Sequence, residues 1–157
     1  MRILGVDPGS LKTGFGIIDL KSRRTTYVAS GVIRIPAVSF PERLHVIFSQ
    51  LGELIDQHRP HEMAIEDIFM ARDARAALKL GQARGAAIVA GSERGLPVSE
   101  YAARLVKQSV VGNGNADKSQ IQFMVRNLLS LSAVPQEDAA DALAVALTHA
   151  VLRTETS

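Results

Sequence analysis

The sequence predicts an α/β protein built on one mixed five-stranded sheet with helices on both of its faces. Three β-rich runs with short connections come first, and two further strands then alternate with helices. The chain has 157 residues, which suits one domain with its own hydrophobic core, and it contains no repeat or linker. We therefore expect a single domain over residues 1–157.

The first half of the chain is expected to form four of the strands and one helix. Turn residues separate the first three strands and favour an antiparallel meander. Apolar side chains then recur at helical spacing until Pro60, which ends the helix. The expected elements are strands at residues 2–7, 13–20 and 25–34, a helix at residues 40–58 and a strand at residues 61–68.

The second half is expected to be mainly helical. Asp73 and Asp117 are suited to cap helix N-termini, and Pro135 is suited to the first position of a helix. The expected elements are a helix at residues 73–94, a strand at residues 97–101, and helices at residues 102–111, 117–131 and 135–152.

Composition excludes several classes of protein. The chain has no Cys, which rules out disulfides and thiolate zinc sites. Its first apolar run is too short for a signal peptide, and no segment approaches the ~20 apolar residues of a membrane span. We expect a cytoplasmic protein with no membrane segment.

Positive charge is concentrated in two stretches, although the whole chain carries only +2. Residues 72–84 and residues 101–126 each carry a net charge of +3, which leaves −4 on the remainder. This segregation is typical of a polyanion-binding face beside an acidic site. Two solvated helix faces would give the same pattern, and charge alone does not separate the two interpretations.

Two carboxylates are expected at the ends of strands. Asp7 ends the first strand between Gly5 and Gly9, where a backbone or a ligand must come close. Glu66 ends the fourth strand in the same manner, so the two carboxylates meet if the strands are parallel neighbours. Asp67, next to Glu66, should point to the opposite face. An ordinary Asp-Pro-Gly turn and a surface acid are the alternatives.

Asp138 and Asp141 form the strongest local signal for a site. Their spacing places both on one face of the last helix, which is otherwise almost entirely apolar and should be buried. Two buried like charges are unfavourable unless a cation compensates them. Acids also stabilise a helix N-terminus, and this alternative explains Asp138 but not Asp141, which lies a turn further along.

The four carboxylates favour Mg²⁺ or Mn²⁺ over Zn²⁺, because no Cys or paired His accompanies them. Two such ions ~4 Å apart can activate water and stabilise the leaving oxygen of a phosphodiester. All four His residues are expected to have packing or surface roles.

Several short segments together resemble the RuvC family of bacterial Holliday-junction resolvases, in order along nearly the whole chain. They are residues 5–10 (GVDPGS), 13–16 (TGFG), 65–70 (IEDIFM), 77–85 (ALKLGQARG), 101–104 (YAAR), 106–108 (VKQ) and 138–144 (DAADALA).

The resemblance implies a ribonuclease-H-like fold and a homodimer that makes Mg²⁺-dependent paired nicks in four-way DNA junctions during recombination and repair, alongside RuvA and RuvB. It implies that Lys107 and Lys118 lie near the scissile phosphate and that Phe69 stacks on bases. For Phe69 the alternative is a packing role at the start of the next helix. By the same resemblance, the catalytic metal ligands are Asp7, Glu66, Asp138 and Asp141. Further DNA-binding candidates from the basic stretches are Arg75, Lys79 and Arg104.

A stripe of small and apolar residues on the long helix suggests how a dimer could form, although packing against the chain's own sheet is the alternative. A junction-binding protein without nuclease activity and a ribonuclease-H-like enzyme acting on RNA–DNA hybrids are the competing functions. The stripe consists of Ala74, Ala77, Leu78, Gly81, Gly85 and Ile88.

Overall fold

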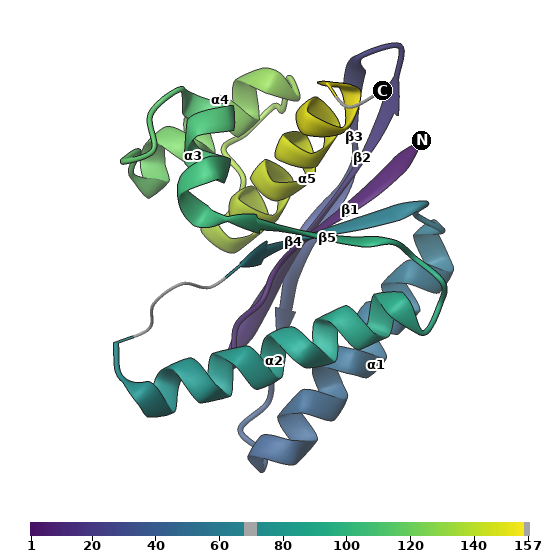
Figure 1. Cartoon of the computed structure of the whole chain (residues 1–157), viewed down its shortest axis with the longest axis vertical. Helices are drawn as coiled ribbons and strands as arrows, with labels where there is room; N and C mark the ends of the chain where they lie inside the picture. Colours follow the sequence, from purple (N-terminus) through teal and green to yellow (C-terminus); the bar gives the residue numbers. More distant parts are fainter. Residues whose placement is uncertain (68–71, 156–157) are drawn as a thin grey trace.

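The computed structural model describes residues 1–67 and 72–155, with side chains described up to Arg153. Five strands form one sheet in the order β3-β2-β1-β4-β5, which confirms the predicted mixed sheet (Figure 1). β1, β2 and β3 are antiparallel neighbours, whereas β4 and β5 continue the sheet in parallel with β1. The strands are β1 (Arg2–Asp7), β2 (Lys12–Lys21), β3 (Arg24–Arg34), β4 (Glu62–Asp67) and β5 (Val98–Ala102).

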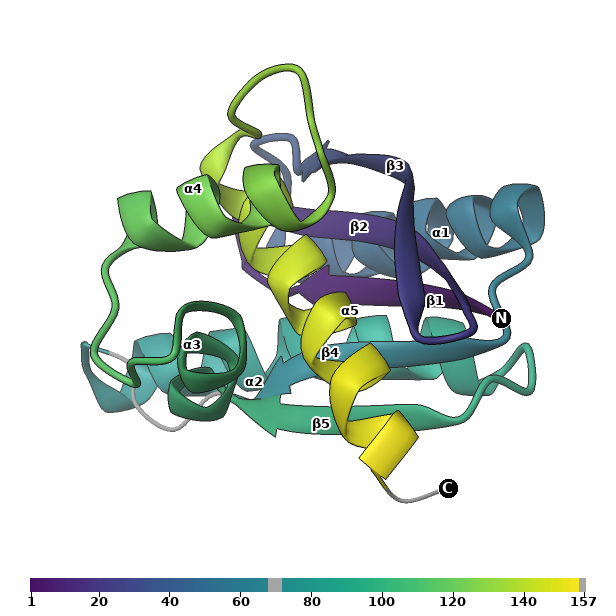
Figure 2. The ribbon, with the colours of Figure 1, turned by 90° about the horizontal axis from the view of Figure 1, so that it is seen from above.

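Helices cover both faces of the sheet, as predicted (Figure 2). The first two helices pack on one face, and the last three pack on the other. None of the helices in the described residues is both long and apolar enough to cross a membrane. The helices are α1 (Phe40–His58), α2 (Ala74–Ser92), α3 (Ala103–Val111), α4 (Lys118–Leu128) and α5 (Glu137–Glu155).

Several predicted helix boundaries differ from the structure. α2 ends at Ser92 rather than residue 94, and α5 continues to Glu155 rather than residue 152. Two further differences have a visible cause. α4 ends at Leu128 rather than residue 131, because Ser130 adopts a left-handed backbone with φ of 52°. α5 begins at Glu137 rather than Pro135, whose carbonyl instead accepts a hydrogen bond from Gln122 of α4.

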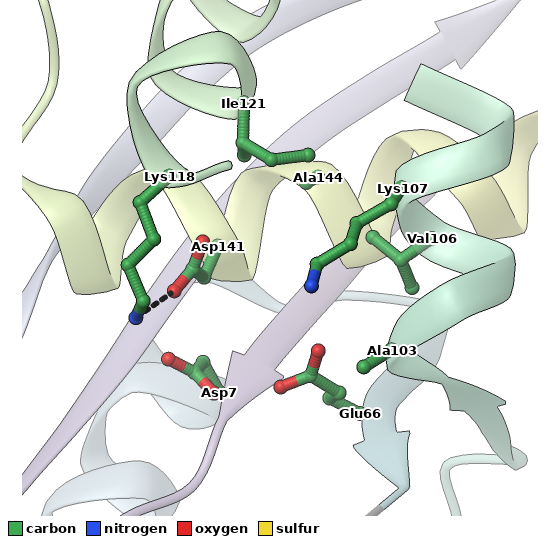
Figure 3. A pocket seen from close by; sticks show the side chains of 9 residues that line it. All are labelled: Asp7, Glu66, Ala103, Val106, Lys107, Lys118, Ile121, Asp141 and Ala144. Atoms are coloured by element: carbon green, nitrogen blue, oxygen red, sulfur yellow. Dashed lines mark hydrogen bonds and ion pairs between the residues drawn. The ribbon is translucent and has the colours of Figure 1, made fainter. Parts of the chain in front are cut away.

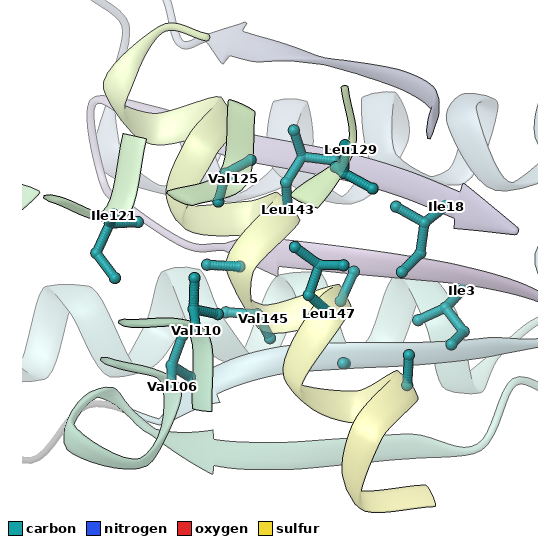
Figure 4. Packing of buried hydrophobic residues seen from close by; sticks show 14 residues of the cluster. Ile3, Ile18, Val106, Val110, Ile121, Val125, Leu129, Leu143, Val145 and Leu147 are labelled. Atoms are coloured by element: carbon teal, nitrogen blue, oxygen red, sulfur yellow. The ribbon is translucent and has the colours of Figure 1, made fainter. Parts of the chain in front are cut away.

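Alternation along β1 divides its side chains between two hydrophobic cores. Leu4 and Val6 face α1 and α2, whereas Ile3 packs in the core beneath α3, α4 and α5 (Figure 4). Asp7 falls on the same side as Ile3, at the carboxyl end of the strand. The side chain of Asp7 is therefore directed towards α5.

Glycines in β1 and β2 let α5 lie directly on the sheet. A Cβ at Gly5 would clash with the carbonyl oxygen of Ala142, and a Cβ at Gly14 would clash with that of Asp138. Gly14 pairs with Asp7 across the two strands. This close approach brings the first turns of α5 to the end of β1.

Candidate active site

The ends of β1 and β4 bring the first two predicted carboxylates together. β1 and β4 are parallel neighbours, which meets the condition under which the two carboxylates were expected to meet, and Val6 lies beside Ile65 in the last pair of their register. Asp7 and Glu66 follow this pair, close enough for each to shift the pKa of the other. Strand alternation sends both towards α5, while Asp67 points to the other face, as expected.

α5 adds a third carboxylate above these two. Asp141 points from α5 into the cavity that Asp7 and Glu66 line from below, and its Oδ2 lies 3.3 Å from Nζ of Lys118 (Figure 3). The cavity has a volume of about 240 Å³. It is lined by Asp7, Glu66, Ala103, Val106, Lys107, Lys118, Ile121, Asp141 and Ala144.

Asp138, the fourth predicted ligand, lies beside the cavity but does not line it. Its carboxylate pairs with Nζ of Lys12 at 3.1 Å and accepts a hydrogen bond from Gln136 at 2.8 Å. Although burial opposes this, these contacts lower the pKa of Asp138 below its ordinary value. Its charge still contributes to the potential at Asp7.

Burial and nearby charges raise the pKa values of the three carboxylates that line the cavity. Burial, followed by the charges of Glu66 and Asp141, raises the pKa of Asp7 from 3.8 to about 9. Burial raises the pKa of Glu66, although the neighbouring Asp7 opposes it. Burial also raises the pKa of Asp141, although Lys118 opposes it. The cluster therefore resists full ionisation unless a cation binds.

The carboxylates fit a hard divalent cation in their chemistry. Oxygen donors with an excess of negative charge are what Mg²⁺ and Mn²⁺ prefer. In residues 1–67 and 72–155, however, no three acidic or His side chains are already gathered at metal-ligand geometry. Asp138 and Asp141 are instead paired with Lys12 and Lys118. A metal bound through all four residues would therefore compete with these two lysines for the carboxylates.

Two lysines face the cavity from different helices. Lys107 reaches in from α3, and Lys118 extends from the start of α4 (Figure 3). Lys118 lies 2.7 Å from Glu137 and 3.3 Å from Asp141. Burial lowers the pKa of Lys118, but the hydrogen bonds and charges of these two acids outweigh it and raise the pKa.

The remaining DNA-binding candidates lie away from the cavity. Arg75 and Lys79 belong to α2, on the opposite face of the sheet, where Nζ of Lys79 lies 5.7 Å from the ring centre of Phe40. Arg104 is exposed on α3 and does not line the cavity. Phe69 lies outside the described residues.

Sequence reasoning missed two cations that organise the acids. Lys12 could have been noticed from its place just after the Asp-Pro-Gly-Ser turn, but nothing in the sequence pairs it with Asp138. Arg84 forms an ion pair of 3.5 Å with Asp67, a partner that the sequence did not reveal. Of the two roles expected for the His residues, packing or surface, His149 has the first, since it is buried between Tyr101 and Glu62.

Comparison with known proteins identifies the family. The family described as "Crossover junction endodeoxyribonuclease RuvC" matches residues 3–149. The chain belongs to the RuvC family. RuvC of Saccharophagus degradans is 65% identical over 148 residues, which cover 94% of this chain and 86% of that protein. RuvC of Teredinibacter turnerae is 63% identical over 153 residues, with the same two coverages.

Solved RuvC structures share the whole fold. Thermus thermophilus RuvC in complex with a Holliday junction substrate is 35% identical, with a TM-score of 0.91, and the match covers 99% of this chain and 97% of that one. The yeast mitochondrial Holliday junction resolvase is 12% identical with a TM-score of 0.71, covering 98% of this chain and 79% of that one, and so shares the fold alone. The predicted ribonuclease-H-like architecture is confirmed.

Proposed function

We propose that this RuvC-family chain is a crossover junction endodeoxyribonuclease that cuts four-way DNA junctions by symmetric paired nicks. The observation that carries the proposal is the cavity in which Asp7, Glu66 and Asp141 converge beside two lysines. Relatives of this chain carry that activity in their names, and one was solved with its junction substrate. The negative charge of the carboxylate cluster favours a bound divalent cation, which is consistent with metal-dependent cleavage of DNA.

The proposed ligands for Mg²⁺, or for Mn²⁺ in its place, are Asp7, Glu66, Asp138 and Asp141. A bound divalent ion supplies Lewis-acid activation of water and of the leaving oxygen. The chain's own contribution is to hold the carboxylates in a cavity whose walls include Val106 and Ile121. No protein nucleophile is required.

Lys107 and Lys118 are proposed to orient the scissile phosphate. Both ammonium groups lie at the cavity, where a phosphate oxygen can approach the carboxylate cluster. Lys118 is protonated at physiological pH, and its acidic neighbours raise its pKa further. When phosphate takes the place of Asp141 as its partner, Asp141 becomes available as a ligand. Phe69 is proposed to stack on bases, while Arg75, Lys79 and Arg104 are proposed to contact more distant phosphates.

The outer face of α2 is proposed as the homodimer interface. Ala74, Ala77 and Leu78 are exposed, with 70% of Leu78 accessible, and a Cβ added at Gly81 or Gly85 would meet no atom within 4 Å. The sheet is instead packed by the opposite stripe of the helix, consisting of Ala83, Ala87, Ala90 and Gly91. Most of the predicted stripe is thus open to solvent, although Ile88 packs partly against the chain's own core. A symmetric dimer through this stripe would present two sites to two strands.

We further propose that residues 1–157 form a single domain that works in the cytoplasm alongside RuvA and RuvB. Family membership supports both partners.

A cleavage assay with mapped nicks tests the proposed activity. With Mg²⁺, a labelled four-way junction should be nicked symmetrically, while linear duplex and RNA–DNA hybrid should remain intact. Asp141→Asn should abolish nicking but retain junction binding, because it removes a ligand and leaves the lysines in place. Junction binding without symmetric nicks would support a binding protein instead, and preferential cutting of the hybrid would support a ribonuclease.

A further inference from the structure

Arg84 of α2 connects the opposite face of the sheet to the strand end that carries Glu66. Its Nε donates a hydrogen bond of 3.0 Å to the main-chain carbonyl of Glu66. Its Nη2 donates to the carboxylate of Glu100 on β5 and lies 3.5 Å from that of Asp67. The guanidinium thus joins α2 to the ends of both β4 and β5.

The hydrogen bond from Arg84 to Glu66 lies at the point where β4 stops pairing with β1. The β1–β4 register ends at Val6 and Ile65, one residue before Glu66, while pairing with β5 continues to Asp67. The carbonyl of Glu66 is held by Arg84 at this end of the strand. The Glu66 side chain meanwhile points to the other side, into the cavity with Asp7.

Burial distinguishes Arg84 from an ordinary surface ion pair. Its side chain is only 15% exposed, whereas those of Asp67 and Glu100 are about half exposed. A planar guanidinium can bind two carboxylates and a carbonyl at once, which the single ammonium of Lys cannot reproduce. These contacts hold the main chain at Glu66, whose buried carboxylate is repelled by that of Asp141.

We propose that Arg84 is a positioning residue for the active site, which fixes the Glu66 main chain so that the Glu66 carboxylate is held ready for metal. This inference rests on the proposed function of the carboxylates. It also gives a role to Asp67 and Glu100, which orient Arg84 from the face opposite the cavity.

The test compares Arg84→Met and Arg84→Lys with a matched control, Arg94→Met. Arg94 likewise joins a carboxylate to a main-chain carbonyl, with hydrogen bonds to Asp56 at 2.9 and 3.2 Å and to the carbonyl of Ala90 at 3.3 Å, but it lies away from the cavity. Mn²⁺ affinity would be measured by electron paramagnetic resonance without DNA, together with thermal stability and single-turnover cleavage. Mutating groups that orient metal ligands typically weakens metal binding by roughly 10–100-fold.

Both Arg84 variants should weaken Mn²⁺ binding and slow cleavage, with Lys less affected than Met, while Arg94→Met leaves Mn²⁺ affinity unchanged. Wild-type affinity in Arg84→Lys would overturn positioning, because charge alone would then suffice. Tighter binding in Arg84→Met would also overturn it and indicate simple repulsion between Arg84 and the metal. Loss of thermal stability in all three variants without a change in affinity would reduce Arg84 to a structural ion pair.

A double-mutant cycle supplies an independent check. Glu100→Gln should weaken Mn²⁺ binding, as Arg84→Met does. The double variant should bind Mn²⁺ little worse than Arg84→Met alone, because both substitutions disrupt the same set of contacts around Arg84. Additive effects would contradict the shared role. If wild-type protein binds Mn²⁺ but does not nick junctions, the proposed function fails while the affinity data still decide the role of Arg84.

Discussion

Asp7→Asn should make the metal-free protein more stable while abolishing its activity. Asp7 lies at the end of β1 among acids that raise its pKa to about 9. Asn keeps the shape and hydrogen-bonding capacity of the side chain but never ionises. The substitution therefore removes the free-energy cost of keeping this carboxyl protonated in the folded state, together with a proposed metal ligand.

The magnitude follows from proton linkage. Between the unfolded pKa of 3.8 and the folded value of about 9, the folded chain holds a proton that the unfolded chain has lost. The free energy of unfolding therefore falls as pH rises through this window, by at most about 1.4 kcal/mol per pH unit. Glu66 and Asp141 take up part of the proton binding, so we expect Asp7→Asn to gain about 2 kcal/mol at pH 8. Near pH 4 the gain should vanish.

Urea unfolding in EDTA and in Mg²⁺, at both pH values, measures these quantities. Mg²⁺ should stabilise the wild type at pH 8 but not Asp7→Asn, because the metal binds only the folded state. A parallel assay should show junction binding without nicking. The reasoning is refuted if the variant is less stable than wild type in EDTA at pH 8, or if Mg²⁺ stabilises both proteins equally.

Three further substitutions probe other parts of the molecule. Lys107→Ala should weaken junction binding and reduce its salt slope by about one, and an unchanged slope in titrations would remove Lys107 from the phosphate path. Gly14→Ala should lower the free energy of unfolding by about 1–3 kcal/mol and slow nicking, because the added methyl group displaces α5 at Asp138. Chemical denaturation measures this change, and wild-type stability would contradict the close packing. Tyr101→Phe removes the 2.6 Å hydrogen bond to buried His149, so it should lower the free energy of unfolding by about 1–3 kcal/mol with little change in nicking. Unchanged stability would count against this bond.

The strand-end carboxylates were predictable because parallel strands place their carboxyl ends at one edge. Alternation and position placed Asp7 and Glu66 at strand ends, but their meeting depended on a strand order that only the structure supplies. Spacing likewise placed Asp138 and Asp141 on one helix face. Spacing does not fix a rotamer or a partner, however, and so could not show that Lys12 draws Asp138 to the rim of the cavity.

Long-range partners and close packing were the parts that the sequence did not reveal. Asp67 and Arg84 are 17 positions apart on different elements, and only the packed fold shows that they meet. Gly5 was expected to admit a backbone or a ligand, and the structure shows that it admits the α5 backbone at Ala142. The left-handed turn at Ser130 could not be foreseen, because Ser does not require that conformation.

The three faces of α2 link dimerisation to the chemistry. One stripe packs on the sheet through small residues, a second is open to solvent, and Arg84 reaches the main chain of Glu66. A partner subunit seated on the open stripe would restrict the motion of the helix that carries Arg84. If the proposed dimer forms through this stripe, the same contact would steady Glu66 in both subunits and so prepare both proposed sites for cleavage.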